Sequence, residues 1–263
     1  MCVTDTSAGV PPERSAQPVR PAATVMLIRD AVAADVTGPG DICAIEVFML
    51  RRTLAAAFGG GMYVFPGGKV EATDGDDVDI AHRLAAVREC FEEAGVLLAR
   101  TATGDHVADG HPALAARHGV HDGSIDLLEL CAEHQLVPAL DELAWVSHWI
   151  TPKGESRRFD TRFFVAPTPA EQSSVHDDNE TIASLWVSPT EALRREVEGD
   201  LTMMPPTIVN LKMLAAFAST EAAMAAARHM PTPSCVLPKL RRDDDGSFVG
   251  LSFPGDGDYD LLE

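Results

Sequence analysis

The sequence has few cysteines, and none of them is spaced to form a local pair. Five cysteines occur in 263 residues, an odd number, and no C-x-x-C spacing is present. This pattern argues against a disulfide framework and against a zinc site built on cysteine. It fits a protein of a reducing compartment, and we expect a cytoplasmic location. The five positions are Cys2, Cys43, Cys90, Cys131 and Cys235.

Basic residues are also scarce. Lysine and arginine number 21 against 40 aspartates and glutamates, so the formal net charge is −19. Nonspecific binding to nucleic acid or to anionic lipid depends on a basic surface, so we expect neither a nucleic acid nor a membrane as a partner. A polyanionic substrate would have to be met by a metal ion and by a few local cations.

Long apolar runs are missing as well. No stretch approaches the length of a membrane span, and the N-terminus lacks the apolar core of a signal peptide. Residues 1–21, rich in Pro, Ser, Thr and charge, are expected to form a disordered tail. The hydrophobic content of 46% allows a sizeable core. We expect one domain over 22–230, with an insert at about 99–140, and an irregular C-terminal extension over 231–263.

The apolar pattern predicts strands and helices in a mixed α/β arrangement. The expected strands cover residues 22–28, 43–50, 143–150, 162–166 and 182–187. The expected helices cover residues 79–94, 126–134, 189–196 and 206–224. The first of these helices carries an apolar stripe and should end at Gly95.

Residues 88–96 read RECFEEAGV and carry the most informative pattern of the chain. Glu89, Glu92 and Glu93 stand at i, i+3 and i+4 of a predicted helix, so they share one face. Clustered like charges call for a compensating cation, and Mg²⁺ or Mn²⁺ prefers carboxylate oxygen. The alternative is a solvated acidic helix face, which is the more common origin of a bare E-x-x-E-E.

A glycine pair precedes this helix. Residues 65–71 read FPGGKVE, and Gly67 and Gly68 suit a tight turn whose backbone must approach a ligand or metal closely. The glycines, the helix and its terminal R-E-x-x-E-E-x-G together resemble the Nudix box of the Nudix hydrolases. The resemblance implies an α/β/α sandwich around a mixed β-sheet, with a largely helical insert in this chain. It also implies hydrolysis of a diphosphate linked to a nucleoside, with Mg²⁺ or Mn²⁺ as cofactor.

The same resemblance assigns roles to residues of the box. Glu89, Glu92 and Glu93 would hold the metal, and Arg88 would orient these carboxylates through charge-assisted hydrogen bonds. The general base is left open between Glu92 and a carboxylate of a later loop, for which Glu180 is the candidate. Glu180 could equally be an exposed acid before a strand.

The box departs from the common pattern between its glycines and its arginine. Residues 71–79 read EATDGDDVD and look like an inserted acidic loop, and Ile80 stands where a further glutamate is expected. One of the loop aspartates could replace that glutamate, or the aspartates could cap the following helix. The aspartates in question are Asp74, Asp76, Asp77 and Asp79.

A second resemblance concerns the substrate. Arg52-Thr53, Gly61 and the glycine pair follow a spacing similar to the coenzyme A signature of coenzyme A and acyl-coenzyme A diphosphatases, with Ala56 and Glu71 as departures. Further stretches look like the nudix-type motif 19 branch, which is associated with acyl-coenzyme A. These stretches are residues 145–150, 151–155, 157–164 and 201–207.

The sequence therefore indicates a hydrolase of the diphosphate of acyl-coenzyme A or coenzyme A. Arg52 is the expected contact to substrate phosphate, and Arg157, Arg158 and Arg162 are weaker candidates. A hydrolase of another nucleoside diphosphate derivative is an alternative. A Nudix-fold sensor that binds a nucleotide metabolite without cleaving it is a further alternative, suggested by the altered box. The oligomeric state is not indicated.

Overall fold

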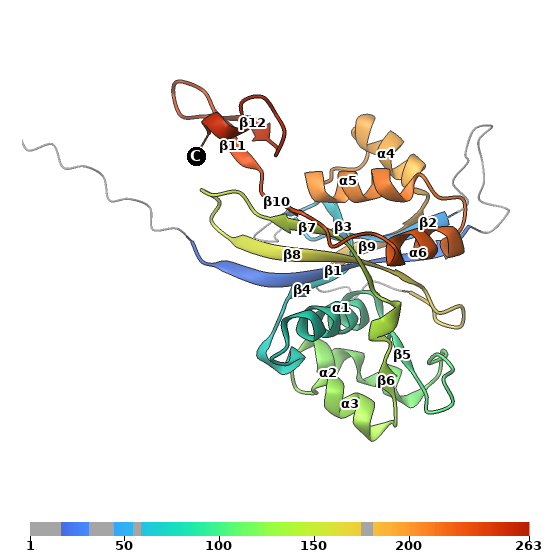
Figure 1. Cartoon of the computed structure of the whole chain (residues 1–263). Coiled ribbons are helices and arrows are strands. Elements are labelled where there is room, and N and C mark those ends of the chain that lie inside the picture. The colour runs from blue at the N-terminus through green and yellow to red at the C-terminus, as the bar shows by residue number, and fades with distance from the viewer. Residues whose placement is uncertain (1–16, 32–44, 55–58, 175–180, 263) are drawn as a thin grey trace, which may run out of the picture.

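The structure is a computed structural model of the chain and describes residues 17–31, 45–54, 59–174 and 181–262. Its centre is a mixed eight-stranded sheet with the order β10-β7-β8-β1-β2-β3, in which β4 also pairs with β1 and β9 with β2 (Figure 1). The pairs β1–β8 and β7–β10 are parallel and the others are antiparallel. The strands are β1 Val19–Asp30, β2 Ile45–Arg52, β3 Tyr63–Val64, β4 Gly67–Lys69, β7 Ala144–Ile150, β8 Arg158–Pro167, β9 Thr181–Val187 and β10 Cys235–Val236.

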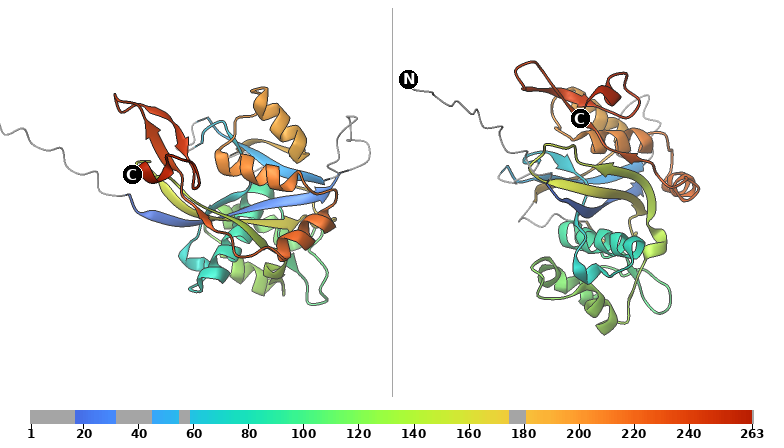
Figure 2. Two further views of the ribbon diagram at one scale, coloured as in Figure 1. Left: turned by 45° about the horizontal axis from the view of Figure 1, so that its top comes forward. Right: turned by 60° about the vertical axis from the view of Figure 1, so that its left-hand side comes forward.

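Alternation along the long central strand divides the core into two layers. Ala23, Val25 and Leu27 of β1 pack on one face of the sheet, and Met26 and Ile28 pack on the other, all with no exposed surface. Helix α1 (Val78–Ala94) and the segment after it cover the first face. Helices α4 (Pro189–Val197), α5 (Pro205–Leu214) and α6 (Thr220–Arg228) cover the second (Figure 2). The expected α/β/α sandwich is confirmed.

Local signals set the ends of α1. The carboxylate of Asp77 accepts hydrogen bonds from the backbone N–H groups of Asp79 and Ile80, both at 3.0 Å. At the other end, Gly95 adopts a left-handed conformation with φ of 72°, and its N–H donates to the carbonyl of Phe91. A side chain is disfavoured in this conformation, so glycine ends the helix where the sequence predicts.

The insert of residues 99–140 packs beneath α1 and combines helical turns with a small ladder. Strands β5 (Ala99–Arg100) and β6 (Val137–Pro138) pair at its base. Its helical elements are the 3₁₀ helix Pro112–Ala116, α2 Arg117–His121 and α3 Leu127–Glu133, and the 3₁₀ helix Leu140–Glu142 follows β6. Apolar residues of these helices join the core layer under α1.

Three expectations about element boundaries need correction. The predicted helix over 206–224 is two helices, because the side chain of Ser219 caps α6 by accepting from the N–H of Ala222. An alanine-rich stretch favours helix on both sides of this cap and hides the break. Strand β1 begins at Val19, within the expected tail, and residues 1–16 of that tail lie outside the described residues.

The third correction concerns the C-terminal extension, which was expected to be irregular. Its first strand, β10, joins the edge of the main sheet beside β7. Strands β11 (Lys239–Arg242) and β12 (Phe248–Ser252) then form an antiparallel hairpin, followed by the 3₁₀ helix Tyr259–Leu261. These strands are two to five residues long and lie between Pro, Gly and Asp turns, so the composition masks them.

Across the described ranges, none of the helices combines the length and apolarity that a bilayer span requires.

Candidate active site

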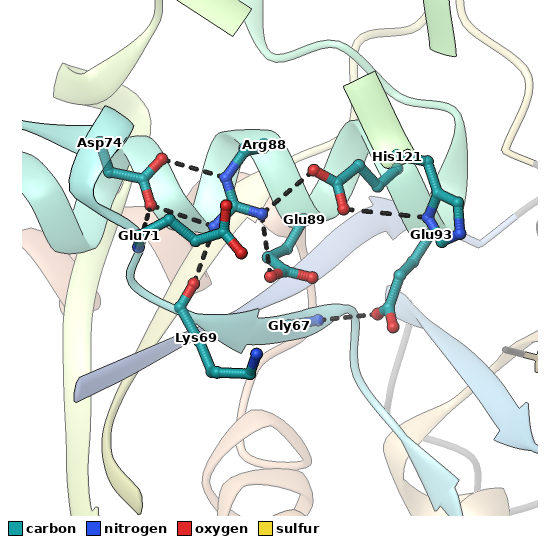
Figure 3. Close-up of polar contacts among 9 residues, drawn as sticks. Gly67, Lys69, Glu71, Asp74, Arg88, Glu89, Glu93 and His121 are labelled. Carbon is teal, nitrogen blue, oxygen red and sulfur yellow. Dashed lines mark hydrogen bonds and ion pairs between the residues drawn. The ribbon is translucent and has the colours of Figure 1, made fainter. Parts of the chain in front are cut away.

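A buried arginine organises the carboxylates of α1. Arg88 is 6% exposed. Its Nη1 donates to Glu89 Oε1 at 3.0 Å and to Glu92 Oε1 at 3.1 Å, and its Nη2 donates to the carbonyl of Lys69 at 2.7 Å (Figure 3). Its Nε and Nη2 donate to the two carboxylate oxygens of Asp74, each at 3.0 Å. One side chain thus orients two carboxylates of α1. It also joins the helix to β4 through Lys69 and to the loop before the helix through a third carboxylate, that of Asp74.

The charge of this arginine is secured by its surroundings. Burial alone would lower the pKa of Arg88, but the hydrogen bonds to Asp74 and the charges of Glu89 and Glu92 outweigh burial and raise the pKa above its usual value. The guanidinium is therefore permanently charged, and it offsets the repulsion between the carboxylates.

Two aspartates of the acidic loop make different contacts, and the expected helix capping is observed for one of them. Asp74, only 3% exposed, ends a 3₁₀ turn (Ala72–Asp74) and pairs with Arg88, while its Oδ2 also accepts the N–H of Glu71 at 2.8 Å. Asp77 caps α1. Ile80, where the common box has glutamate, is 48% exposed. The inserted loop therefore supplies a buried carboxylate to the arginine.

The glycine pair does not form the tight turn that the sequence suggested. Gly67 and Gly68 lie in β4, which pairs antiparallel with β1. A Cβ on Gly67 would lie 2.5 Å from the carbonyl oxygen of Ala23, and one on Gly68 would lie 2.3 Å from Glu89 Oε1. The backbone here is closely approached by β1 and by a carboxylate of α1. The expected approach to a ligand or metal stays a prediction. The N–H of Gly67 donates to Glu93 Oε2 at 2.9 Å.

Glu92 and Glu93 are almost enclosed, with exposed fractions of 8% and 4%. Burial raises the pKa of Glu92 above its usual value, against the opposing effects of Arg88 and His121. His121 Nδ1 lies 3.9 Å from Glu92 Oε2. The guanidinium Nε of Arg117 donates to the backbone carbonyl of Glu92 at 3.0 Å.

His121 and Arg117 were not singled out from the sequence. Both belong to α2 of the insert, which packs on α1 from about 25 residues further along the chain. Their positions in the sequence do not indicate a contact with the box, because only the folded insert brings them close to the carboxylates.

All the box carboxylates face one large cleft of about 1090 Å³. Glu89, Glu92, Glu93, Gly67 and Gly68 line it on the side of α1 and β4. Arg52 at the end of β2 lines the same cleft. Its remaining wall is mainly apolar and includes Trp149, Phe159, Met203, Met204, Pro205 and residues of the C-terminal hairpin.

The other candidate cations are placed unequally. Arg157 lines the cleft. Arg158 is buried and its Nε donates to the carbonyl of Thr151 at 3.0 Å. Arg162 pairs with Asp79 and lies 4.3 Å from the ring centroid of Trp145. Arg158 and Arg162 therefore support the sheet and do not line the cleft. The candidate base Glu180 lies outside the described residues.

The donor set of the cleft fits a hard divalent cation. Within the described part of the chain, no three His, Cys, Asp or Glu side chains form a ready-made metal cage. Mg²⁺, however, is usually held by one or two carboxylates, with water and substrate phosphate at the other positions. Glu89, Glu92 and Glu93 offer oxygen donors in one cleft. Gly68 leaves room for the Glu89 carboxylate, which a Cβ at that position would obstruct.

Comparison with known proteins identifies the family. Residues 76–214, just over half of the chain, match the family model described as the NUDT19 Nudix domain. The acyl-coenzyme A diphosphatase NUDT19 of Gallus gallus is 29% identical over 262 aligned residues, covering 76% of this chain and 69% of that protein. The protein of the same name from Homo sapiens is 36% identical over 152 residues, covering 54% of this chain and 40% of that protein.

A solved structure agrees with this match. The crystal structure of a Nudix hydrolase from Alicyclobacillus acidocaldarius superposes with a TM-score of 0.70 at 29% identity, covering 82% of this chain and 99% of that one. The likeness thus extends over most of the chain. The chain belongs to the Nudix family, in the group defined by the NUDT19 Nudix domain.

Proposed function

We propose that the protein is a divalent-metal-dependent hydrolase of the diphosphate bond of acyl-coenzyme A or coenzyme A. The products would be 3′,5′-ADP and (acyl-)4′-phosphopantetheine. The observation that carries the proposal is the set of box carboxylates, held by Arg88 in a cleft of about 1090 Å³. The names of the chicken and human relatives supply the substrate class.

The residues of the chain would divide the work as follows. Glu89, Glu92 and Glu93 would hold Mg²⁺ or Mn²⁺, which when bound neutralises the diphosphate and lowers the pKa of water. Arg88 keeps the first two carboxylates oriented, and the N–H of Gly67 orients the third. Each carboxylate therefore has a fixed direction before substrate arrives.

Two groups are proposed as acceptor of the proton from the attacking water. Glu92 is one, because its Oε2 is not the oxygen that Arg88 holds. Glu180 is the other, as the sequence suggested. The water oxygen bonds to phosphorus, the bridging oxygen leaves with the bond electrons, and the proton passes to the carboxylate. Arg52, and secondarily Arg157, would contact substrate phosphates in the cleft.

The altered box spacing was the reason to consider a sensor that binds without cleaving. Asp74 weakens that reason, because the inserted loop delivers its carboxylate to Arg88 and the acidic end of the helix remains assembled. A cytoplasmic location and a small-molecule partner complete the proposal. The described cysteines Cys90, Cys131 and Cys235 are all free thiols, in keeping with a reducing compartment.

The proposal is tested by hydrolysis of acyl-coenzyme A in ¹⁸O-labelled water, with products identified by mass spectrometry. We expect equal amounts of 3′,5′-ADP and acyl-phosphopantetheine, with ¹⁸O in only one of them, which identifies the phosphorus attacked. Free coenzyme A, NADH and ADP-ribose are tested as alternative substrates in the same assay. Cleavage of NADH or ADP-ribose without cleavage of any coenzyme A species would favour the alternative substrate class, and binding without any product would favour the sensor.

A further inference from the structure

The chain beyond residue 230 is anchored to the enzyme body and reaches the cleft. Strand β10 extends the sheet by pairing in parallel with β7, with Cys235 opposite His148 and Val236 opposite Trp149. After the hairpin, Phe253 returns to Trp149 with an edge contact between rings at 6.3 Å. Both ends of the hairpin are thus attached at one place on the sheet edge.

The hairpin is also braced by its own C-terminal end. The ammonium of Lys239 donates to the carbonyls of Tyr259 at 2.9 Å and Leu262 at 2.8 Å, and it lies 4.4 Å from the centroid of the tyrosine ring. The hydroxyl of Tyr259 donates in turn to the carbonyl of Leu237 at 2.7 Å. These contacts fix the position of the hairpin, so that it can form one wall of the cleft.

One side of this wall is apolar and faces the cleft of the box carboxylates. Leu240 of β11 stands opposite Leu251 of β12, and both line the cleft together with Phe248 and Pro238. Phe248 is 60% exposed. In Figure 2 the hairpin lies on the side of the sheet that carries α4 and α5, away from α1. The acidic and the apolar linings therefore belong to different parts of one cleft.

This division matches the two parts of an acyl-coenzyme A molecule. The diphosphate would bind beside the carboxylates, the metal they would hold, and Arg52. The acyl chain is apolar, and covering the exposed ring of Phe248 with it removes apolar surface of both partners from water. Free coenzyme A has no such chain and would leave the wall exposed.

We propose that the hairpin of β11 and β12 binds the acyl chain, through Leu240, Phe248 and Leu251, and so sets the preference for acyl-coenzyme A over free coenzyme A. The proposal rests on the proposed function, since it assigns part of the same cleft. It concerns a segment beyond the residues that match the family model.

The neighbouring residue Val249 provides a matched control. It is as exposed as Phe248, at 60%, and stands next to it in β12, but it does not line the cleft. The full-length chain and its Phe248→Ala and Val249→Ala variants are assayed with free coenzyme A and with acetyl-, hexanoyl- and dodecanoyl-coenzyme A. We expect Phe248→Ala to lower kcat/KM roughly tenfold for the dodecanoyl ester and to leave free coenzyme A unchanged. Val249→Ala should match the unaltered chain throughout.

Each result is decisive. Equal losses for free and dodecanoyl-coenzyme A, or equal effects of the two variants, would overturn the acyl-binding role while leaving the hydrolase intact. A change of oligomeric state in Phe248→Ala, measured by light scattering, without a change in selectivity would also overturn it, by assigning the ring to an interface. Failure of the unaltered chain to cleave any coenzyme A species would instead refute the proposed function.

Discussion

Glu93 links α1 to β4 through a hydrogen bond from the backbone, and this makes it the sharpest residue to test. Its Oε2 accepts the N–H of Gly67 at 2.9 Å. Glu93→Gln keeps an oxygen for that hydrogen bond but removes the charge offered to the metal. We therefore expect kcat to fall by about 100-fold or more, with an unchanged unfolding midpoint. Turnover with Mg²⁺ and with Mn²⁺ is measured beside thermal unfolding.

The exposed residue Glu133 of α3 serves as the control, because Glu133→Gln removes the same charge far along the chain from the box. It should leave turnover unchanged. Near-normal activity of Glu93→Gln with both metals would contradict the role assigned to this carboxylate.

Gly68 offers a test of the packing between β4 and α1. A Cβ at this position would lie 2.3 Å from Glu89 Oε1, which is the far end of a flexible side chain. The carboxylate can move aside without unfolding the strand, so Gly68→Ala should lower activity roughly tenfold and leave stability nearly unchanged. Gly257→Ala is the control, since a Cβ there meets nothing within 4 Å. Full activity of Gly68→Ala would mean that the position of Glu89 is not critical.

At the scale of elements, the inserted acidic loop and α1 act as one unit through Asp74 and Arg88. Removing the aspartate leaves a buried guanidinium with fewer charged partners, although Glu89 and Glu92 remain. We expect Asp74→Ala to reduce the free energy of unfolding by about 3 kcal/mol. Urea unfolding followed by circular dichroism measures the change. Asp76→Ala, exposed on the same loop, should change it by less than about 0.5 kcal/mol, and equal effects of the two variants would refute the pairing.

How far the sequence predicts an element depends on how local its signal is. Helix α1 and its carboxylate face follow from spacing within nine residues, and the fold class follows from the same motif with the apolar strands. The break at Ser219 was missed because alanine-rich sequence on both sides favours helix. The hairpin was missed because its strands are short and its apolar residues have no local period.

The site shows the same limit. Arg88, its neighbouring glutamates and the glycine pair are recognisable from residue spacing, and the structure brings them into one cleft. His121 comes from the insert and lies within 3.9 Å of Glu92 only after the insert packs on α1. Choosing Asp74 over the other loop aspartates requires the 3₁₀ turn that aims it at the arginine. Contacts between segments that are distant in the sequence cannot be predicted from residue spacing.

At the scale of the whole molecule, the net charge of −19 opposes the approach of a polyanionic substrate. Like charges reduce the rate of encounter, and salt screens this repulsion, with a Debye length of about 10 Å at 0.1 M ionic strength. We expect kcat/KM to rise about two- to fivefold between roughly 10 and 150 mM KCl at fixed free Mg²⁺. The kcat should stay constant, because the repulsion slows the association of substrate and does not act on the steps after binding.

A variant with fewer surface charges separates this long-range effect from local binding. Glu129→Gln combined with Glu133→Gln neutralises two exposed carboxylates of α3 that do not line the cleft. It should raise kcat/KM at low salt and reduce the dependence on KCl, with both curves meeting at high salt. A kcat/KM that falls as KCl is added would mean that the field of Arg52 and its neighbouring cations governs encounter, and that the acidic surface is too far from the cleft to matter.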